Sequence, residues 1–223
     1  MTEPFIEEDV PPRREPIFNA PWPAMALTLV IIGSFVIQMQ LPERVWADYV
    51  LTPAVVTQYG RWVTLLTPLF LHGGWIHDLM NASAALAFGT PVARLFGLNA
   101  RGALAFLLFY LACGLLSSLG YVMAHPDSMA PVVGASGAVS GLMGGASRLM
   151  EGRGRLGPLV SRTTVGMAFM WTVVNLIIGY VPVMPGTGGA GIAWEAHVAG
   201  YFAGLLLIAP FARIAGHNPV LNG

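Results

Sequence analysis

Long apolar stretches alternate along this chain with short breaks rich in glycine, proline or charged residues. An α-helix rises about 1.5 Å per residue, so roughly 20 consecutive apolar residues cross the hydrocarbon core of a membrane. All but the fourth of the predicted helices approach that length. The six predicted helices cover residues 24–41, 75–96, 101–123, 136–148, 163–180 and 194–214. The pattern therefore predicts an all-α, polytopic membrane protein built as a six-helix bundle.

The stretch between the first two predicted helices, residues 42–74, is apolar but does not have the pattern of a span. It is interrupted by Pro53, Pro68 and the pair Gly73 and Gly74. Proline and glycine interrupt helices because proline lacks an N–H donor and glycine has the most backbone freedom to lose. We expect this segment to be a loop lying in or on the outer membrane interface.

The remaining segments predict a simple domain organisation. One membrane domain, residues 23–214, lies between short tails at 1–22 and 215–223. The tail at the N-terminus is acidic and rich in proline, unlike a cleavable signal sequence. Residues 181–193 are rich in glycine and predict a mobile loop between the last two helices.

The arginines predict the orientation of the chain in the membrane. All eleven basic residues are arginine, and basic residues are enriched in cytoplasmic loops. With the N-terminus inside, nine arginines face the cytoplasm and only Arg44 and Arg61 lie outside. The nine are Arg13, Arg14, Arg94, Arg101, Arg148, Arg153, Arg155, Arg162 and Arg213. We therefore expect a multi-pass integral membrane protein with both termini cytoplasmic, and the short tails and absence of lysine favour a prokaryotic plasma (inner) membrane.

Composition agrees with a lipid environment and narrows the partners. Apolar residues make up 55% of the chain and charged residues 10%, whereas soluble domains carry about a quarter charged residues. The mean hydropathy is +0.66. The net charge is zero and there is no basic patch, which argues against a nucleic-acid partner. Cys113 is the single cysteine, so an internal disulfide is excluded.

Polar residues gather at one end of three helices that all run in the same direction. The helix at 75–96 begins with His77 and Asn81, that at 136–148 with Ser136, and that at 194–214 with His197. Residues of this kind are expensive within a membrane and indicate function. The acidic residues beside the histidines, Asp78 and Glu195, are expected at the wet outer boundary.

The fourth predicted helix is too short to cross the membrane. The eleven residues from Ser136 to Ala146 span roughly 16 Å. The preceding segment contains Pro131, so it must enter the protein as irregular chain, which is tolerated at depth only beside protein or water. We therefore expect Ser136 to lie below the outer surface beside a wet cavity.

Glycine spacing predicts which helices meet. Gly137 and Gly141 recur every four residues after Ser136, as a small-residue track that lets two helix backbones approach closely. Gly200 and Gly204 lie on the same stripe as His197. If the two glycine faces pack together, the side chains of Ser136 and His197 come within reach of each other.

This combination has the chemistry of an activated serine. A hydroxyl becomes a good nucleophile when a neighbouring histidine takes its proton. The oxyanion that forms next requires hydrogen-bond donors. Candidate donors are the backbone N–H of Ser136, at a helix N-terminus, and the side chains of His77 and Asn81.

Three motifs carry a resemblance to a known family: LHGGWIHDLMN at 71–81, GASG at 134–137 and AHVAGYFAG at 196–204. Together, in this order and on these helices, they resemble the rhomboid intramembrane serine proteases. The similarity covers roughly residues 62–207. Each motif is weak alone, but three in the right order are fairly specific.

The resemblance implies a serine endopeptidase with a rhomboid-like six-helix fold. It implies Ser136 as nucleophile, His197 as general base, and His77 and Asn81 as the groups that bind the oxyanion and substrate. His72 lies at the family's other loop histidine, where a purely structural role is the simpler interpretation.

The resemblance also describes partners and moving parts. Family members cut transmembrane protein substrates within or near the lipid bilayer, with a Ser-His dyad and without metal or cofactor. The helix at 163–180 and the loop at 181–193 correspond to the family's mobile fifth helix and cap loop. Many members place an aromatic residue one turn after the serine, packed on the histidine. This chain has Ser140 there, so another group must orient His197.

Other interpretations of the same residues remain open. Glycines in a short helix also serve tight packing, a kink or a polar pore, and His77 and Asn81 could simply pin their helix to a loop. A metal site is not expected, because no HExxH motif is present and Glu195 and His197 lie about 200° apart on a helix. The alternative classes are a proteolytically inactive rhomboid-like protein that binds transmembrane clients, and a small-solute transporter or channel.

Overall fold

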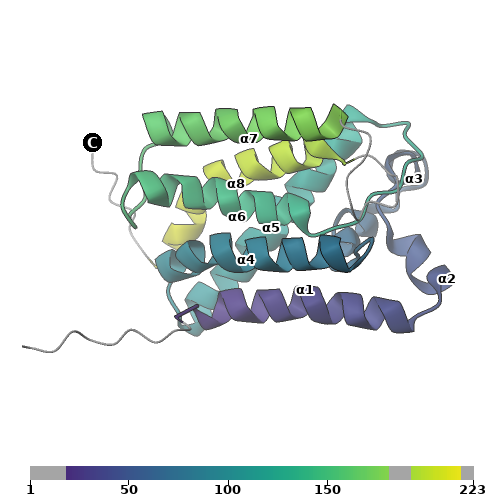
Figure 1. The fold of residues 1–223 in the computed structure, drawn as a ribbon, viewed down its shortest axis with the longest axis horizontal. Coiled ribbons are helices and arrows are strands. Elements are labelled where there is room, and N and C mark those ends of the chain that lie inside the picture. The colour runs from purple at the N-terminus through teal and green to yellow at the C-terminus, as the bar shows by residue number, and fades with distance from the viewer. Residues whose placement is uncertain (1–18, 181–191, 217–223) are drawn as a thin grey trace, which may run out of the picture.

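The predicted long helices are all present in the computed structural model, which describes residues 19–180 and 192–216 (Figure 1). They are α1 (Trp22–Gln40), α4 (Trp75–Phe96), α5 (Ala100–Ala124), α6 (Ser136–Glu151), α7 (Arg162–Tyr180) and α8 (Trp194–Ile214). The predicted all-α fold is therefore confirmed. Most of the predicted tails, 1–22 and 215–223, and of the predicted mobile loop, 181–193, lies outside the described residues.

The segment between α1 and α4 is more regular than the sequence suggested. It contains α2 (Glu43–Trp46), η1 (Ala47–Tyr49), α3 (Pro53–Tyr59), η2 (Trp62–Leu65) and η3 (Thr67–Phe70). Pro53 and Pro68 lie in the first turns of α3 and η3, where the missing N–H has no helical partner to lose and the fixed φ favours a helix start. The prolines therefore begin short helices here instead of breaking a long one.

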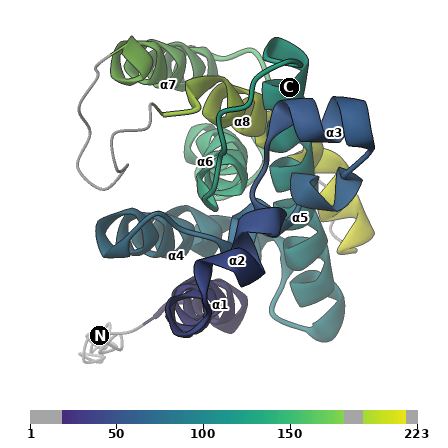
Figure 2. The ribbon, with the colours of Figure 1, turned by 90° about the vertical axis from the view of Figure 1, so that its right-hand side faces the viewer.

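Within the described residues, four helices are long and apolar enough to cross a membrane by length and composition: α1, α5, α7 and α8. Of the other two long helices, α4 and α6, only α6 is buried on most of its surface. Seen along the bundle, α6 is surrounded by α4, α5, α7 and α8 (Figure 2). Consistent with this position, most side chains of α6 are buried, whereas on α7 only Thr164 and Asn175 are buried.

The helices α6 and α8 approach each other closely along a track of glycines. A Cβ added at Gly200 would overlap the carbonyl oxygen of Gly137, and one added at Gly204 would overlap that of Gly141. Gly144 faces the carbonyl oxygen of Tyr201 in the same way. The predicted meeting of the two glycine faces is therefore present, and it fixes the height of α8 against α6.

Substituting Gly204→Ala should destabilise the protein, because the new methyl group displaces the backbone of α6. Overpacking of this kind typically costs about 1–3 kcal/mol, and we expect a lower Tm in detergent micelles. Gly166→Ala on α7 is the matched control, since an added Cβ there meets nothing within 4 Å. Equal Tm values for the two variants would contradict the tight contact.

Candidate active site

The chain leading to Ser136 is irregular but firmly anchored. Val132 pairs with Leu51 through two backbone hydrogen bonds of 3.0 and 2.8 Å. The N–H of Gly134 donates to the carbonyl oxygen of Pro68 at 2.9 Å. The segment 42–74 therefore holds the approach to α6, and Ser136 is the first residue of that helix.

Gly134 lets His77 lie beside the serine. Its φ of +127° is a conformation that favours glycine. A Cβ at this position would lie 2.8 Å from ring atoms of His77 and 3.5 Å from the Ser136 Oγ. A side chain at residue 134 would thus displace His77 from the neighbourhood of Ser136.

The structure brings the side chains of Ser136 and His197 together. His197 is in the first turn of α8, and its Nε2 lies 2.7 Å from the Ser136 Oγ. The glycine contacts of α6 and α8 follow this pair along both helices. From α5, the hydroxyl of Ser117 donates to the carbonyl oxygen of Ala196 at 2.7 Å, which ties the first turn of α8 to a third helix.

A residue that the sequence analysis missed touches the other side of the imidazole. The Oδ1 of Asn175, on α7, lies 2.7 Å from His197 Nδ1. Asn175 is only 2% exposed. A signal was available, because Asn175 is the one amide side chain in a mostly apolar helix, and polar residues within a membrane indicate function.

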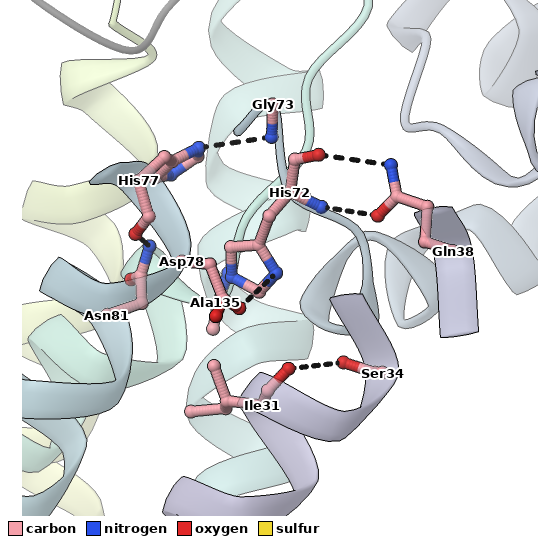
Figure 3. Close-up of polar contacts among 9 residues, drawn as sticks. All are labelled: Ile31, Ser34, Gln38, His72, Gly73, His77, Asp78, Asn81 and Ala135. Carbon is pink, nitrogen blue, oxygen red and sulfur yellow. Dashed lines mark hydrogen bonds and ion pairs between the residues drawn. The ribbon is translucent and has the colours of Figure 1, made fainter. Parts of the chain in front are cut away.

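His77 and Asn81 share one face of α4 and line the same cavity as Ser136. The N–H of Gly73 approaches the His77 Nδ1 at 3.5 Å (Figure 3). With Nδ1 as acceptor, a neutral ring carries its hydrogen on Nε2, which is free to donate. The Asn81 Nδ2 donates to the His77 carbonyl oxygen at 2.9 Å, and its second hydrogen remains available.

Beside His77, the ring of His72 supports the turn that precedes Ser136 (Figure 3). Burial and the neighbouring His77 lower the pKa of His72 to about 3, so its ring is neutral near pH 7. The Ala135 N–H donates to His72 Nε2 at 3.4 Å. The opposite nitrogen, Nδ1, lies 3.3 Å from Asp78 Oδ1, although the alignment falls short of a hydrogen bond. His72 thus links α4 to the start of α6.

The expected position of Asp78 at the wet outer boundary is wrong. Its side chain has no exposed surface and faces His72. Glu195 matches the expectation better, since it is partly exposed and lies 2.8 Å from His125 Nε2. The physical difference is that the 71–74 loop folds over the start of α4 and covers Asp78, which a helix-by-helix view of the sequence does not reveal.

A cavity of about 300 Å³ unites the predicted site residues. Ser136, His197, His77 and Asn81 all line it. Its apolar walls come from α4 and α7, which lie on either side of α6 (Figure 2). The wall residues include Met80, Ala84 and Phe88 from α4 and Trp171, Val174 and Ile178 from α7.

Within residues 19–180 and 192–216, no three histidine, cysteine, aspartate or glutamate side chains are grouped so that they could hold a metal ion. The arrangement is instead a hydroxyl, an imidazole on one side of it, and two further donors across the cavity. This geometry suits nucleophilic attack on a carbonyl carbon.

Comparison with known proteins identifies the family. The model of the rhomboid domain matches residues 59–214, so this chain belongs to the rhomboid family. Its fold is accordingly a rhomboid-like helical membrane bundle, and the protein is a multi-pass integral membrane protein.

Several relatives are similar over part of the chain. YdcA of Bacillus subtilis is 31% identical over 126 residues, which cover 55% of this chain and 60% of YdcA. The rhomboid protease GluP of the same organism is 40% identical over 85 residues, 38% of this chain and 15% of GluP. The human Rhomboid-related protein 3 is 32% identical over 133 residues, 55% of this chain and 30% of that protein. The chain thus matches less than two thirds of the length of each.

Gln38 provides a test of the loop that carries His72. Its buried side chain donates to the His72 carbonyl oxygen at 3.0 Å and accepts from the His72 N–H at 2.9 Å. Gln38→Leu leaves both backbone groups unpaired, at a cost of about 1–3 kcal/mol each. We expect a clear fall in Tm in detergent, whereas Gln40→Leu, an exposed position on the same helix, should leave it nearly unchanged. A similar Tm for both variants would argue against this anchor.

Proposed function

We propose that this protein is an intramembrane serine endopeptidase that hydrolyses peptide bonds in or near the transmembrane segments of membrane-anchored proteins. The observation that carries the proposal is the 2.7 Å contact between Ser136 Oγ and His197 Nε2, in a cavity shared with His77 and Asn81. The family membership and the similarity to the rhomboid protease GluP support it.

In the first step, Ser136 Oγ attacks the carbonyl carbon of the scissile bond. The hydroxyl proton moves to His197 Nε2 as the new C–O bond forms, because the imidazole nitrogen is already in contact with the hydroxyl. Collapse of the tetrahedral intermediate breaks the C–N bond, and the imidazolium returns the proton to the leaving amine. Water then hydrolyses the acyl-enzyme with His197 again acting as base.

The negative charge on the tetrahedral oxygen is bound by donors on both sides of Ser136. The first N–H groups of a helix have no intrahelical partner, and Ser136 opens α6. Opposite them, His77 Nε2–H and the free hydrogen of the Asn81 amide complete the set. These groups are fixed before reaction, so they stabilise the oxyanion with little reorganisation.

The walls of the cavity favour an apolar, membrane-embedded substrate. Apolar side chains line the cavity around its polar site residues. They include Met80 and Phe88 from α4 and Val174 and Ile178 from α7. A segment that leaves the lipid between α4 and α7 keeps its apolar residues covered on the way to Ser136. A helical peptide bond is shielded by its own hydrogen bonds, so the segment must unwind where it is cut.

The proposal includes the orientation of the chain. We infer that the cavity lies towards the outer face and that the tails at 1–22 and 215–223 are cytoplasmic, on either side of the membrane domain at 23–214. The arginine distribution supports this, since Arg94, Arg148 and Arg213 lie in the last turns of helices whose first turns carry the site. A prokaryotic inner membrane fits the same features.

Substitution of the two central residues tests the proposal. Ser136→Ala and His197→Ala should each reduce cleavage of a model single-span substrate in detergent by about 10⁴-fold or more, because each removes a participant in proton transfer. Ser34→Ala on α1 is the matched control, because its hydroxyl bonds the Ile31 carbonyl oxygen and does not line the cavity. Cleavage by both variants at the wild-type rate would refute the protease assignment.

The oxyanion groups give a second test. Asn81→Ala should lower kcat by about 10²–10³-fold, the usual effect of losing one such donor, while an activated-serine probe still labels Ser136. Thr90→Val on the same helix removes a hydroxyl that bonds only the Leu86 carbonyl oxygen and should be neutral. Wild-type protein that binds a transmembrane client but neither labels nor cleaves would instead indicate the proteolytically inactive alternative.

A further inference from the structure

Both ring nitrogens of His197 have a partner, and the two partners come from different helices. Nε2 faces the Ser136 hydroxyl on α6 and Nδ1 faces the Asn175 amide on α7, each at 2.7 Å. A neutral imidazole carries one hydrogen and one lone pair on its two nitrogens. Which nitrogen carries the hydrogen decides whether Ser136 faces a base.

The second bond of Asn175 settles that question. Its Nδ2 donates to the Trp171 carbonyl oxygen at 2.9 Å. A backbone carbonyl oxygen only accepts, so the amide nitrogen must face Trp171 and the amide oxygen must face His197. An oxygen opposite Nδ1 requires Nδ1 to be the donor, which leaves Nε2 as the acceptor for the Ser136 hydroxyl.

The position of Asn175 against His197 is held by a second contact one turn further along both helices. Trp171, four residues before Asn175, stacks on Tyr201, four residues after His197, with ring centroids 6.3 Å apart and planes at 26°. Residues four apart share a helix face. The Asn175–His197 and Trp171–Tyr201 contacts therefore form two successive rungs between α7 and α8.

Asn175 is buried, so its hydrogen bonds must offset the free-energy cost of placing an amide in an apolar environment. A buried amide without partners is unfavourable in an apolar medium, and Asn175 is only 2% exposed on a mostly apolar helix. The position after Ser136 that would place an aromatic ring near His197 is occupied by Ser140, whose hydroxyl bonds the Ser136 carbonyl oxygen at 2.7 Å. Ser140 therefore does not orient the imidazole.

We propose that Asn175 is the positioning residue of the site, which extends the Ser-His pair to a Ser136–His197–Asn175 array spread over three helices. This inference rests on the proposed protease function. Asn175 stays neutral and takes no proton. It holds the Nδ1–H tautomer and the ring plane, and it accepts a stronger hydrogen bond when His197 becomes imidazolium during attack.

Kinetics of substituted proteins test this role. Asn175→Leu keeps the size of the side chain but removes the acceptor, and should lower kcat about 100-fold with KM within threefold of wild type. Asn175→Asp retains an acceptor for Nδ1–H but loses the donor to Trp171, so its kcat should lie between those of wild type and Asn175→Leu. Thr172→Val, which removes a hydroxyl bonded only to the Ala168 carbonyl oxygen on α7, is the matched control and should keep wild-type kcat. All variants are compared at equal folded fraction from their melting curves.

A spectroscopic measurement separates this proposal from the protease assignment. In ¹⁵N NMR of the histidine rings, wild-type His197 should show Nδ1 protonated and Nε2 bare, and Asn175→Leu should show a mixture of tautomers. If wild-type protein fails to cleave but the His197 tautomer still changes from wild type to Asn175→Leu, the protease activity is refuted and the positioning role of Asn175 stands. Unchanged tautomer and kcat in Asn175→Leu would overturn the positioning role while leaving the protease intact.

Discussion

The close backbone contact between α6 and α8 is the constraint on which the site depends. Glycines on both helices allow carbonyl oxygens of α6 to lie where side chains would otherwise be. Any larger residue would separate the helices, and the imidazole of His197 would then leave the hydroxyl of Ser136. In a membrane, where lipid and side chains are equally apolar, such packing and the hydrogen bonds it permits hold helices together.

The second requirement is that the start of α6 stays in place. Irregular chain carries unpaired backbone groups, and here the Leu51–Val132 pairing, the Pro68 carbonyl oxygen and the His72 ring satisfy them. Each partner comes from the segment before α4. The short helices of residues 42–74 therefore do more than cover an interface, because they hold the turn that precedes Ser136 in place.

Hydropathy and glycine spacing were sufficient to predict the six long helices and the α6–α8 contact, because both depend on local composition and helical period. The predicted pairing of Ser136 with His197 followed from that contact. The burial of Asp78 and the regular pieces of 42–74 were not predictable in this way, since they depend on how a loop folds back over a helix. The sequence shows that Asn175 is polar, but not that it contacts His197. That contact depends on the register of α7 against α8, which Trp171 and Tyr201 set.

The order of the helices along the chain has a consequence for biosynthesis. The proposed nucleophile and oxyanion donors belong to α6 and α4, whereas His197 and Asn175 belong to α8 and α7, which are made last of the described helices. Chains are synthesised and begin to fold from the N-terminus. A nascent or truncated chain therefore displays a serine with no base beside it. Under the proposed mechanism, Ser136 gains its base only once α8 has been inserted, so an incomplete chain would not yet cleave peptide bonds.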